Sequence, residues 1–119
     1  MKIKINRVRG TNLAEIISDE VLIHETQDAI DLMGESNYLG SRKIIMNEKN
    51  VIPEFFDLKT GIAGEILQKF STYHMKVAIV GDYSKYASKS LRDFISESNR
   101  HGQINFVSSI EEARERLIG

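Results

Sequence analysis

The fold is decided by the stretch from Ile52 to Ser84, IPEFFDLKTGIAGEILQKFSTYHMKVAIVGDYS, which joins a turn, a helix and a strand in direct succession. Ile62, Ile66 and Phe70 are spaced four residues apart and form one apolar stripe at the period of an amphipathic helix. The run Val77 to Val80 is apolar without alternation, which is typical of a central parallel strand with both faces covered. The stretch therefore predicts an α/β domain.

Strands and helices alternate through the rest of the chain. Residues 1–9 and 13–18 predict an N-terminal antiparallel hairpin with its turn at residues 10–12. The alternation of this first strand slips between Ile5 and Val8, which suits either a bulge or an early strand end. Further strands are expected at residues 43–46 and 104–107, and further helices at 26–37, 87–101 and 110–117.

Short connections between alternating strands and helices favour right-handed crossovers. We therefore expect one α/β domain over residues 1–119, with a single-layer, mostly parallel sheet of about five strands, an antiparallel N-terminal hairpin and about four helices. The compact segment from Pro53 should place Phe55 and Phe56 in the core, and the last helix should bury Ile110, Ala113 and Leu117.

Composition narrows the class of protein. With 16 Lys and Arg against 17 Asp and Glu, the formal charge is −1, so no global field draws the chain to nucleic acid or to an anionic membrane. The absence of cysteine excludes disulfides, thiolate metal sites and thiol nucleophiles. The apolar runs are far shorter than the roughly 20 residues that span a bilayer. We therefore expect a cytoplasmic protein without nucleic-acid or membrane partners.

Three runs of sequence resemble one bacterial family. They are FFDLKTGIAGEILQKF at 55–70, VAIVGDYS at 77–84 and LRDFISESNR at 91–100. On these runs the chain is identified as a member of the family catalogued as domain of unknown function 4180, over most of its length from about Asp28 to Leu117. The family name itself implies no activity.

The order of the motifs also resembles the sulfate-transporter and anti-sigma-factor-antagonist (STAS, SpoIIAA-like) domains. The elements that carry this resemblance are Asp57, then Thr60 and Gly61 at a helix start, then the strand and glycine loop at 77–81, and Ser-x-x-Glu-Ala at 109–113. The resemblance implies a SpoIIAA-like fold and a non-enzymatic binding module, sometimes switched when a kinase phosphorylates the Ser or Thr at that helix start. The antagonists place Asp directly before this residue, whereas two residues separate Asp57 from Thr60 here. Of the functional residues of these domains, the resemblance therefore implies a counterpart only at Thr60.

A candidate site follows from the helix start at Thr60. The Thr60 hydroxyl can accept a hydrogen bond from an amide two or three residues on, which makes it a helix cap or, alternatively, a phospho-acceptor. Gly61 and Gly64 leave the first turn bare, and the helix dipole favours an anion there. The glycine spacing favours close packing over phosphate binding, because no Gly-Lys-Ser/Thr follows.

The loop after the central strand completes the candidate site. In a standard crossover the start of a helix and the end of the next strand share one edge of the sheet, where open α/β sheets usually bind ligands. The predicted binding or switch residues are Asp57, Thr60, Gly61, Gly64, Gly81, Asp82, Tyr83 and Ser84. His24, His74 and His101 lack the spacing of metal ligands and no nucleophile motif is present, so we expect no metal, no cofactor and no catalytic residue.

Two classes of function fit these residues. The first is a regulatory or protein-interaction module with a protein partner, switched at Thr60. The alternative is a small-molecule binding protein or weak enzyme for an anionic or apolar ligand in the crevice near Thr60 and Ser84. The two differ in whether Phe56, Tyr83 and Tyr86 surround a cavity or fill it. A third hypothesis is a homo-oligomer subunit that assembles through the edge of the hairpin.

Overall fold

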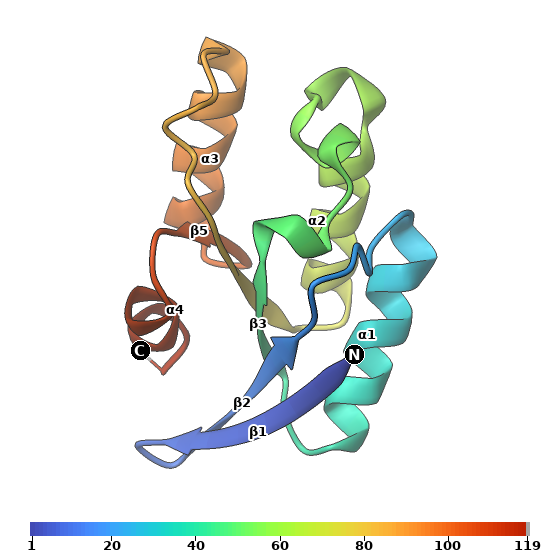
Figure 1. Cartoon of the computed structure of the whole chain (residues 1–119), viewed down its shortest axis with the longest axis vertical. Helices are drawn as coiled ribbons and strands as arrows, with labels where there is room; N and C mark the ends of the chain where they lie inside the picture. Colours follow the sequence, from blue (N-terminus) through green and yellow to red (C-terminus); the bar gives the residue numbers. More distant parts are fainter. Residues whose placement is uncertain (119) are drawn as a thin grey trace.

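A computed structural model describes residues 1–118, which form a five-stranded sheet with four α-helices (Figure 1). The elements in order are β1 (Lys2–Val8), β2 (Thr11–Ile17), α1 (Thr26–Tyr38), β3 (Lys43–Asn47), α2 (Ile62–Thr72), β4 (Lys76–Val80), α3 (Lys89–His101), β5 (Ile104–Val107) and α4 (Ile110–Ile118). Three short 3₁₀ turns, η1 (Glu48–Asn50), η2 (Pro53–Phe56) and η3 (Leu58–Thr60), connect β3 to α2.

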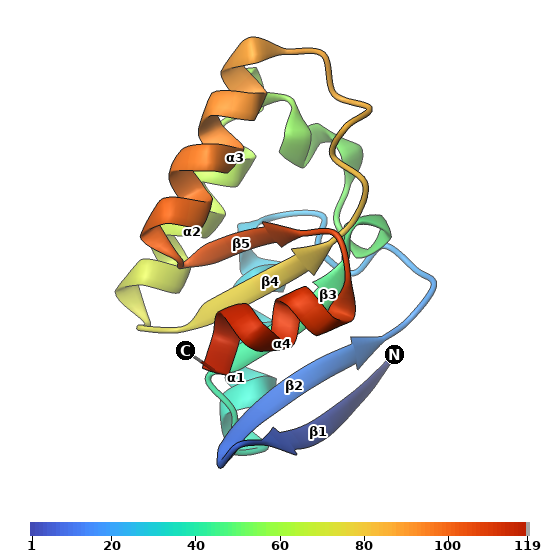
Figure 2. The same cartoon turned by 90° about the vertical axis from the view of Figure 1, so that its left-hand side faces the viewer.

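The strands lie in sequence order, β1-β2-β3-β4-β5. β1 pairs antiparallel with β2, and all the other neighbouring strands are parallel. The predicted α/β class, with a mostly parallel sheet and an N-terminal hairpin, is therefore confirmed. Figure 2 shows α4 on one side of the sheet and α1 behind it on the other. Every helix described over residues 1–118 is too short or too polar to span a bilayer.

The larger core lies between the sheet and helices α1, α2 and α3. The strands contribute alternate residues to it, because successive side chains of a strand point to opposite faces. Phe55 and Phe56 are buried in this core, as the sequence predicts. Its main strand and helix residues are Ala14, Ile16, Ile44, Met46, Val77, Ile79, Ile104 and Phe106 from the sheet and Ala29, Met33, Ala63, Ile66, Phe70 and Leu91 from the helices.

A smaller core lies on the opposite face, under α4 alone. It consists of Leu13, Ile45, Ala78, Val107, Ala113 and Leu117. Because Ala78 packs on this face while Val77 and Ile79 pack on the other, β4 is covered on both faces, as its apolar run predicts. The prediction that Ile110 is buried is wrong, since it is 37% exposed at the first turn of α4.

The hairpin is more regular than the sequence suggests. Its register runs without interruption from Lys2 opposite Ile17 to Val8 opposite Thr11, so β1 contains neither a bulge nor an early end. The turn is not at residues 10–12 but at Arg9 and Gly10, with φ angles of 49° and 80°. A two-residue turn with positive φ at both positions matches the twist of the paired strands. Val8 therefore stays in register and packs against the smaller core.

A partly buried ion pair ties β2 to α4. The Glu15 side chain, on the face under α4, accepts hydrogen bonds from Arg114 Nε and Nη2, both at 3.0 Å, and from Asn6 Nδ2 at 3.0 Å. Glu15 is only 6% exposed. Burial raises the pKa of this carboxyl, but the bonds from Arg114 and Asn6 outweigh burial and hold the pKa below its ordinary value.

Removing the guanidinium should therefore destabilise the protein in a pH-dependent way. We expect Arg114→Met to lower the free energy of unfolding at pH 7 by about 1–3 kcal/mol, less than for a fully buried pair because Arg114 is partly exposed. A depressed folded-state pKa contributes stability above the unfolded-state pKa, and this contribution is lost as pH falls through the folded-state value. Urea unfolding at neutral and acid pH should thus show the deficit shrinking at acid pH.

A matched control is available on α3. Lys89 pairs with Asp93 at 2.8 Å, but both side chains are exposed. We expect Lys89→Met to leave the free energy of unfolding essentially unchanged at both pH values, because exposed ion pairs contribute little. A deficit for Arg114→Met that is equally large at both pH values would show that lost packing, and not the ion pair, causes it.

Candidate functional site

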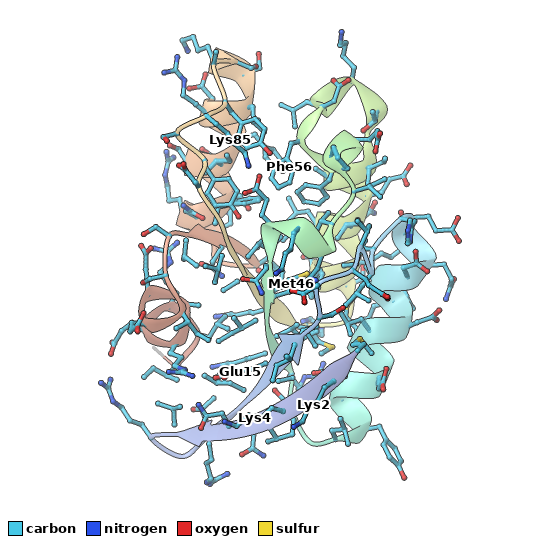
Figure 3. All side chains as sticks on the ribbon, in the orientation of Figure 1. Lys2, Lys4, Glu15, Met46, Phe56 and Lys85 are labelled. Atoms are coloured by element: carbon cyan, nitrogen blue, oxygen red, sulfur yellow. The ribbon has the colours of Figure 1, made fainter. Side chains whose placement is uncertain are left out.

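The predicted site lies at the edge of the sheet formed by the carboxyl ends of the parallel strands. The turns η1, η2 and η3 leave this edge after β3 and lead to α2, and residues 81–88 leave it after β4 and lead to α3. Both connections lie on the same side of the sheet, and α2 and α3 both begin on that side (Figure 1). In Figure 3, Phe56 lies in the space between α2 and α3, with Lys85 nearby.

Aromatic side chains fill the crevice between these connections. The Phe56 ring stacks on Tyr86 with a centroid distance of 5.1 Å and lies 5.9 Å from the Tyr83 ring. Tyr83 meets Phe106 edge-on at 5.3 Å, and its hydroxyl donates a hydrogen bond to the Ile79 carbonyl at 2.7 Å. Burial raises the pKa of Tyr83 above its ordinary value. Because Phe56 is only 7% exposed and the rings touch one another, they fill the crevice and do not surround a cavity.

Glu48, directly after β3, connects the two loops. Its carboxylate accepts a hydrogen bond from the Tyr86 hydroxyl at 2.6 Å and pairs with Lys85 Nζ at 2.7 Å. The pKa of Tyr86 is raised, first by burial and then by its bond to this carboxylate, so the phenol stays protonated at any ordinary pH. The Glu48 side chain thus holds the loop after β4 against the loop after β3.

Gly81 is required by this arrangement. A Cβ added at Gly81 would lie 2.6 Å from Glu48 Oε1 and 2.8 Å from Glu48 Cβ. A Cβ atom essentially never comes within 3.0 Å of a non-bonded atom, and Glu48 Cβ is too close to its own backbone to swing aside. The glycine after the central strand is therefore explained by the side chain that crosses it.

Thr60 lies at the end of η3 and just before the start of α2. Its exposed hydroxyl is 2.8 Å from the Asp57 carbonyl, to which it can donate, and it accepts the Ile62 amide at 3.3 Å. This last bond is the predicted contact to an amide two residues on, but the N-cap position of α2 itself is occupied by Gly61. The Asp57 carboxylate accepts the Lys59 amide at 3.2 Å and so caps the 3₁₀ turn.

The two glycines of this region have different explanations. Gly61 has a φ of 77°, a conformation that disfavours any side chain. Gly64 has an ordinary helical conformation, and a Cβ added to either glycine would meet no atom within 4 Å. The prediction that both glycines permit close packing is therefore wrong.

Asp82 and Ser84 form a local turn. The Asp82 carboxylate accepts the Ser84 amide at 3.1 Å and the Ser84 hydroxyl at 2.6 Å. The bond from the Ser84 hydroxyl, and then the bond from its amide, lower the pKa of Asp82. These polar groups are satisfied by each other and remain exposed to solvent.

Several of the predicted residues line open depressions, and these depressions are separate. Asp57 lines one of about 620 Å³ together with Ser88 and Ser90 at the start of α3. Residues 81–84 line another, of about 660 Å³, against Ser108 and Glu112. Gly64 lines a third, further along α2. The aromatic cluster contributes Phe56 to the first depression and Tyr83 and Phe106 to the second.

Sequence reasoning missed Glu48. No local pattern distinguishes this residue from Lys49 beside it, since its partners lie 37 and 38 positions further along the chain. The neighbouring depression, of about 350 Å³, is lined by Glu48, Lys49, Phe56, Lys85 and Tyr86, among others. Within residues 1–118, no three His, Asp and Glu side chains gather closely enough to hold a metal ion.

Comparisons with known proteins bear on the family alone. No curated protein and no solved structure matches the chain at a significant level. One family model, described as "Domain of unknown function (DUF4180)", matches residues 8–117. This range includes the three runs at 55–70, 77–84 and 91–100 on which the resemblance rests. The chain therefore belongs to the DUF4180 family.

Proposed function

We propose that this protein is a non-enzymatic regulatory module of the cytoplasm, which binds a protein partner through residues 57–64 and 81–86 at the carboxyl edge of its sheet. The observation that carries the proposal is the filling of the crevice by Phe56, Tyr83 and Tyr86. A filled crevice offers little enclosed volume to a small molecule, but it gives a protein partner a firm surface with polar groups along its rim. The resemblance to anti-sigma-factor antagonists supports the same class of function.

Thr60 is the proposed switch on this surface. Its hydroxyl is exposed, and phosphorylation would remove the proton that the hydroxyl donates to the Asp57 carbonyl. The new phosphate would gain from the positive end of α2 and from Lys59, and it would repel the carboxylates of Asp57 and Glu65. Because α2 attracts the phosphate while the neighbouring carboxylates repel it, phosphorylation shifts the conformation of the 3₁₀ turn η3. This turn is part of the proposed surface.

The test compares partners recovered by Thr60 variants in cells that make the protein naturally. We expect Thr60→Ala to retain the partner. With Thr60→Glu the amount of partner recovered should fall at least about tenfold, which corresponds to 1.4 kcal/mol of binding free energy. Thr72→Glu introduces the same acidic side chain at the exposed far end of α2 and should leave recovery unchanged. Mass spectrometry should detect phosphate on Thr60.

Two results would contradict the proposal. Equal recovery by Thr60→Ala and Thr60→Glu, without phosphate on Thr60, would remove the switch. The alternative of a small-molecule site near Thr60 and Ser84 predicts instead that phosphorylated metabolites raise the melting temperature of the purified protein. A clear rise that is lost in Ser84→Ala would favour that alternative over a protein-binding surface.

A further inference from the structure

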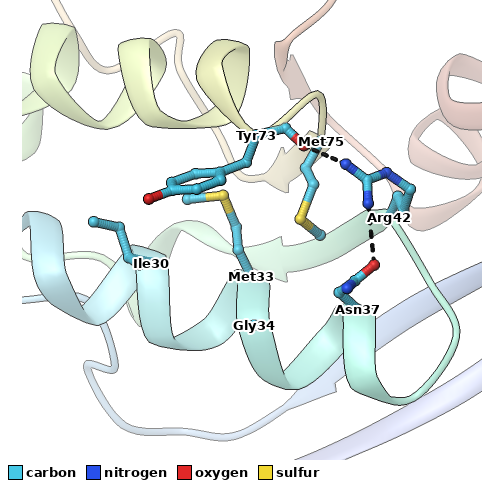
Figure 4. Close-up of a pocket in the computed structure, with 7 residues that line it drawn as sticks. All are labelled: Ile30, Met33, Gly34, Asn37, Arg42, Tyr73 and Met75. Carbon is cyan, nitrogen blue, oxygen red and sulfur yellow. Dashed lines mark hydrogen bonds between the residues drawn. The ribbon is translucent and has the colours of Figure 1, made fainter.

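A pocket of about 200 Å³ lies at the opposite edge of the sheet, where the parallel strands begin (Figure 4). It is formed between α1 and the turn that joins α2 to β4. The residues that line it are Ile30, Met33, Gly34, Asn37, Arg42, Tyr73 and Met75. The carboxyl edge that carries the proposed partner surface contributes none of them, so this pocket is a second, separate site.

The lining of the pocket is suited to an aromatic ring. Met33 and Met75 are buried and line the pocket, and Tyr73, which also lines it, is 46% exposed. Thioethers make favourable contacts with aromatic rings, and a tyrosine ring can stack on another ring. An apolar cavity of about 150 Å³ is enough to hold benzene. The pocket therefore has room for one ring with a small substituent.

Gly34 keeps the pocket open. It lies inside α1, where glycine is less favourable than alanine. Its φ is not in the left-handed region, and a Cβ at this position would meet no atom within 4 Å. Neither backbone strain nor close packing therefore explains the glycine, whereas any larger side chain would project into the space that Gly34 leaves at the wall of the pocket.

Arg42 supplies a positive charge at one end of the pocket. Figure 4 shows Arg42 and Asn37 at one end, with Ile30 at the other and the Tyr73 ring toward it. The guanidinium donates one hydrogen bond to Asn37 Oδ1 at 3.1 Å and another to the Tyr73 carbonyl. An arginine has five N–H donors, so donors remain after these two bonds.

The charge of Arg42 is not matched by a carboxylate. Among residues 1–118, no Asp or Glu oxygen lies within 4.0 Å of it. The carboxyl ends of α1 and α2 both lie at this edge, and each offsets part of the charge through its dipole. A carboxylate held in the plane of the guanidinium would use the remaining donors and complete the neutralisation.

We propose that this pocket binds a small carboxylic acid with a single aromatic ring. The ring lies against Met33, Met75 and Tyr73, and the carboxylate accepts hydrogen bonds from Arg42. Gly34 leaves the volume that the ring occupies. The inference concerns the amino edge of the sheet, and it stands or falls separately from the partner surface at the carboxyl edge.

Benzoate is the probe for this site, and amide shifts in two-dimensional NMR are the measurement. We expect saturable shifts at Gly34 and Met75 at millimolar benzoate or below, because a ligand with so few heavy atoms binds weakly. Gly34→Leu should fill the pocket and weaken binding at least about tenfold, a change of 1.4 kcal/mol. It should not destabilise the fold, since leucine is a better helix former than glycine.

Two controls separate the pocket from other effects. Gln68→Leu adds the same side chain at an exposed position of α2, outside this pocket and outside residues 57–64, and should leave benzoate binding unchanged. Benzamide, which has the ring without the charge, should bind at least about tenfold more weakly than benzoate, because charged hydrogen bonds are about twice as strong as neutral ones. Absent saturation, binding that survives Gly34→Leu, or equal binding of benzamide would each overturn the proposal.

Discussion

Replacing Phe56 by alanine should lower the free energy of unfolding by about 3–5 kcal/mol, the usual cost of removing a buried phenylalanine ring. Phe56 is 7% exposed and contacts Phe55, Tyr83, Tyr86 and Phe106. The substitution leaves a cavity that these rings cannot close without moving both connections at the carboxyl edge. Urea unfolding monitored by tyrosine fluorescence should measure the loss.

The control for Phe56→Ala is Tyr38→Ala. Tyr38 is also aromatic but is 88% exposed at the end of α1, so its removal should change stability by less than about 0.5 kcal/mol. A loss below about 1 kcal/mol for Phe56→Ala would mean that the crevice collapses or is not filled by this ring. In that case the crevice would no longer favour a protein-binding surface over a ligand cavity.

The second large effect is expected at Gly81. Its added Cβ would lie 2.8 Å from Glu48 Cβ, so Gly81→Ala forces the loop after β4 away from η1. Overpacking of this kind costs about 1–3 kcal/mol. Displacing Glu48 also breaks its bonds to Lys85 and Tyr86. We therefore expect Gly81→Ala to lower the free energy of unfolding and also to weaken partner binding, because residues 81–86 belong to the proposed surface.

A double-mutant cycle identifies the cause. In a Glu48→Gly background the side-chain atoms that clash are absent. Adding Gly81→Ala to this background should therefore lower the free energy of unfolding by less than about 0.5 kcal/mol. Gly34→Ala is the control for adding a methyl group where there is space, and it should stabilise the protein by about 0.5–1 kcal/mol. An undiminished cost of Gly81→Ala without the Glu48 side chain would show that the backbone of the loop, and not this contact, requires glycine.

Local patterns predict much of this fold because they report which side chains are buried. The stripe of Ile66 and Phe70 and the apolar run at 77–80 both became core, as expected. Gly102 ends α3 with a φ of 84°, in the left-handed conformation that is usual for a glycine after a helix. The errors fall at element ends, where a residue more or less costs little energy. Examples are the hairpin turn, which lies at Arg9 and Gly10, and Gly61 in place of Thr60 at the N-cap position.

The candidate site was predicted less completely than the fold. Thr60 and residues 81–84 are at the same edge of the sheet, since that follows from the order of strands and helices alone. That Asp57 and residues 81–84 line separate depressions follows from the size and direction of the rings between them. No periodicity carries that information.

By itself, the sequence determined the class of fold, the burial of the central strand and the family to which the chain belongs, because hydrophobic period and motif order are properties of neighbouring residues. Only the tertiary structure decided which distant residues meet. Glu48 reaches Tyr86 across 38 positions, and Glu15 reaches Arg114 across 99. Arg42 meets the Tyr73 carbonyl in the same way. These contacts depend on how the helices pack on the sheet, and packing depends on shapes that come together only when the whole chain is folded.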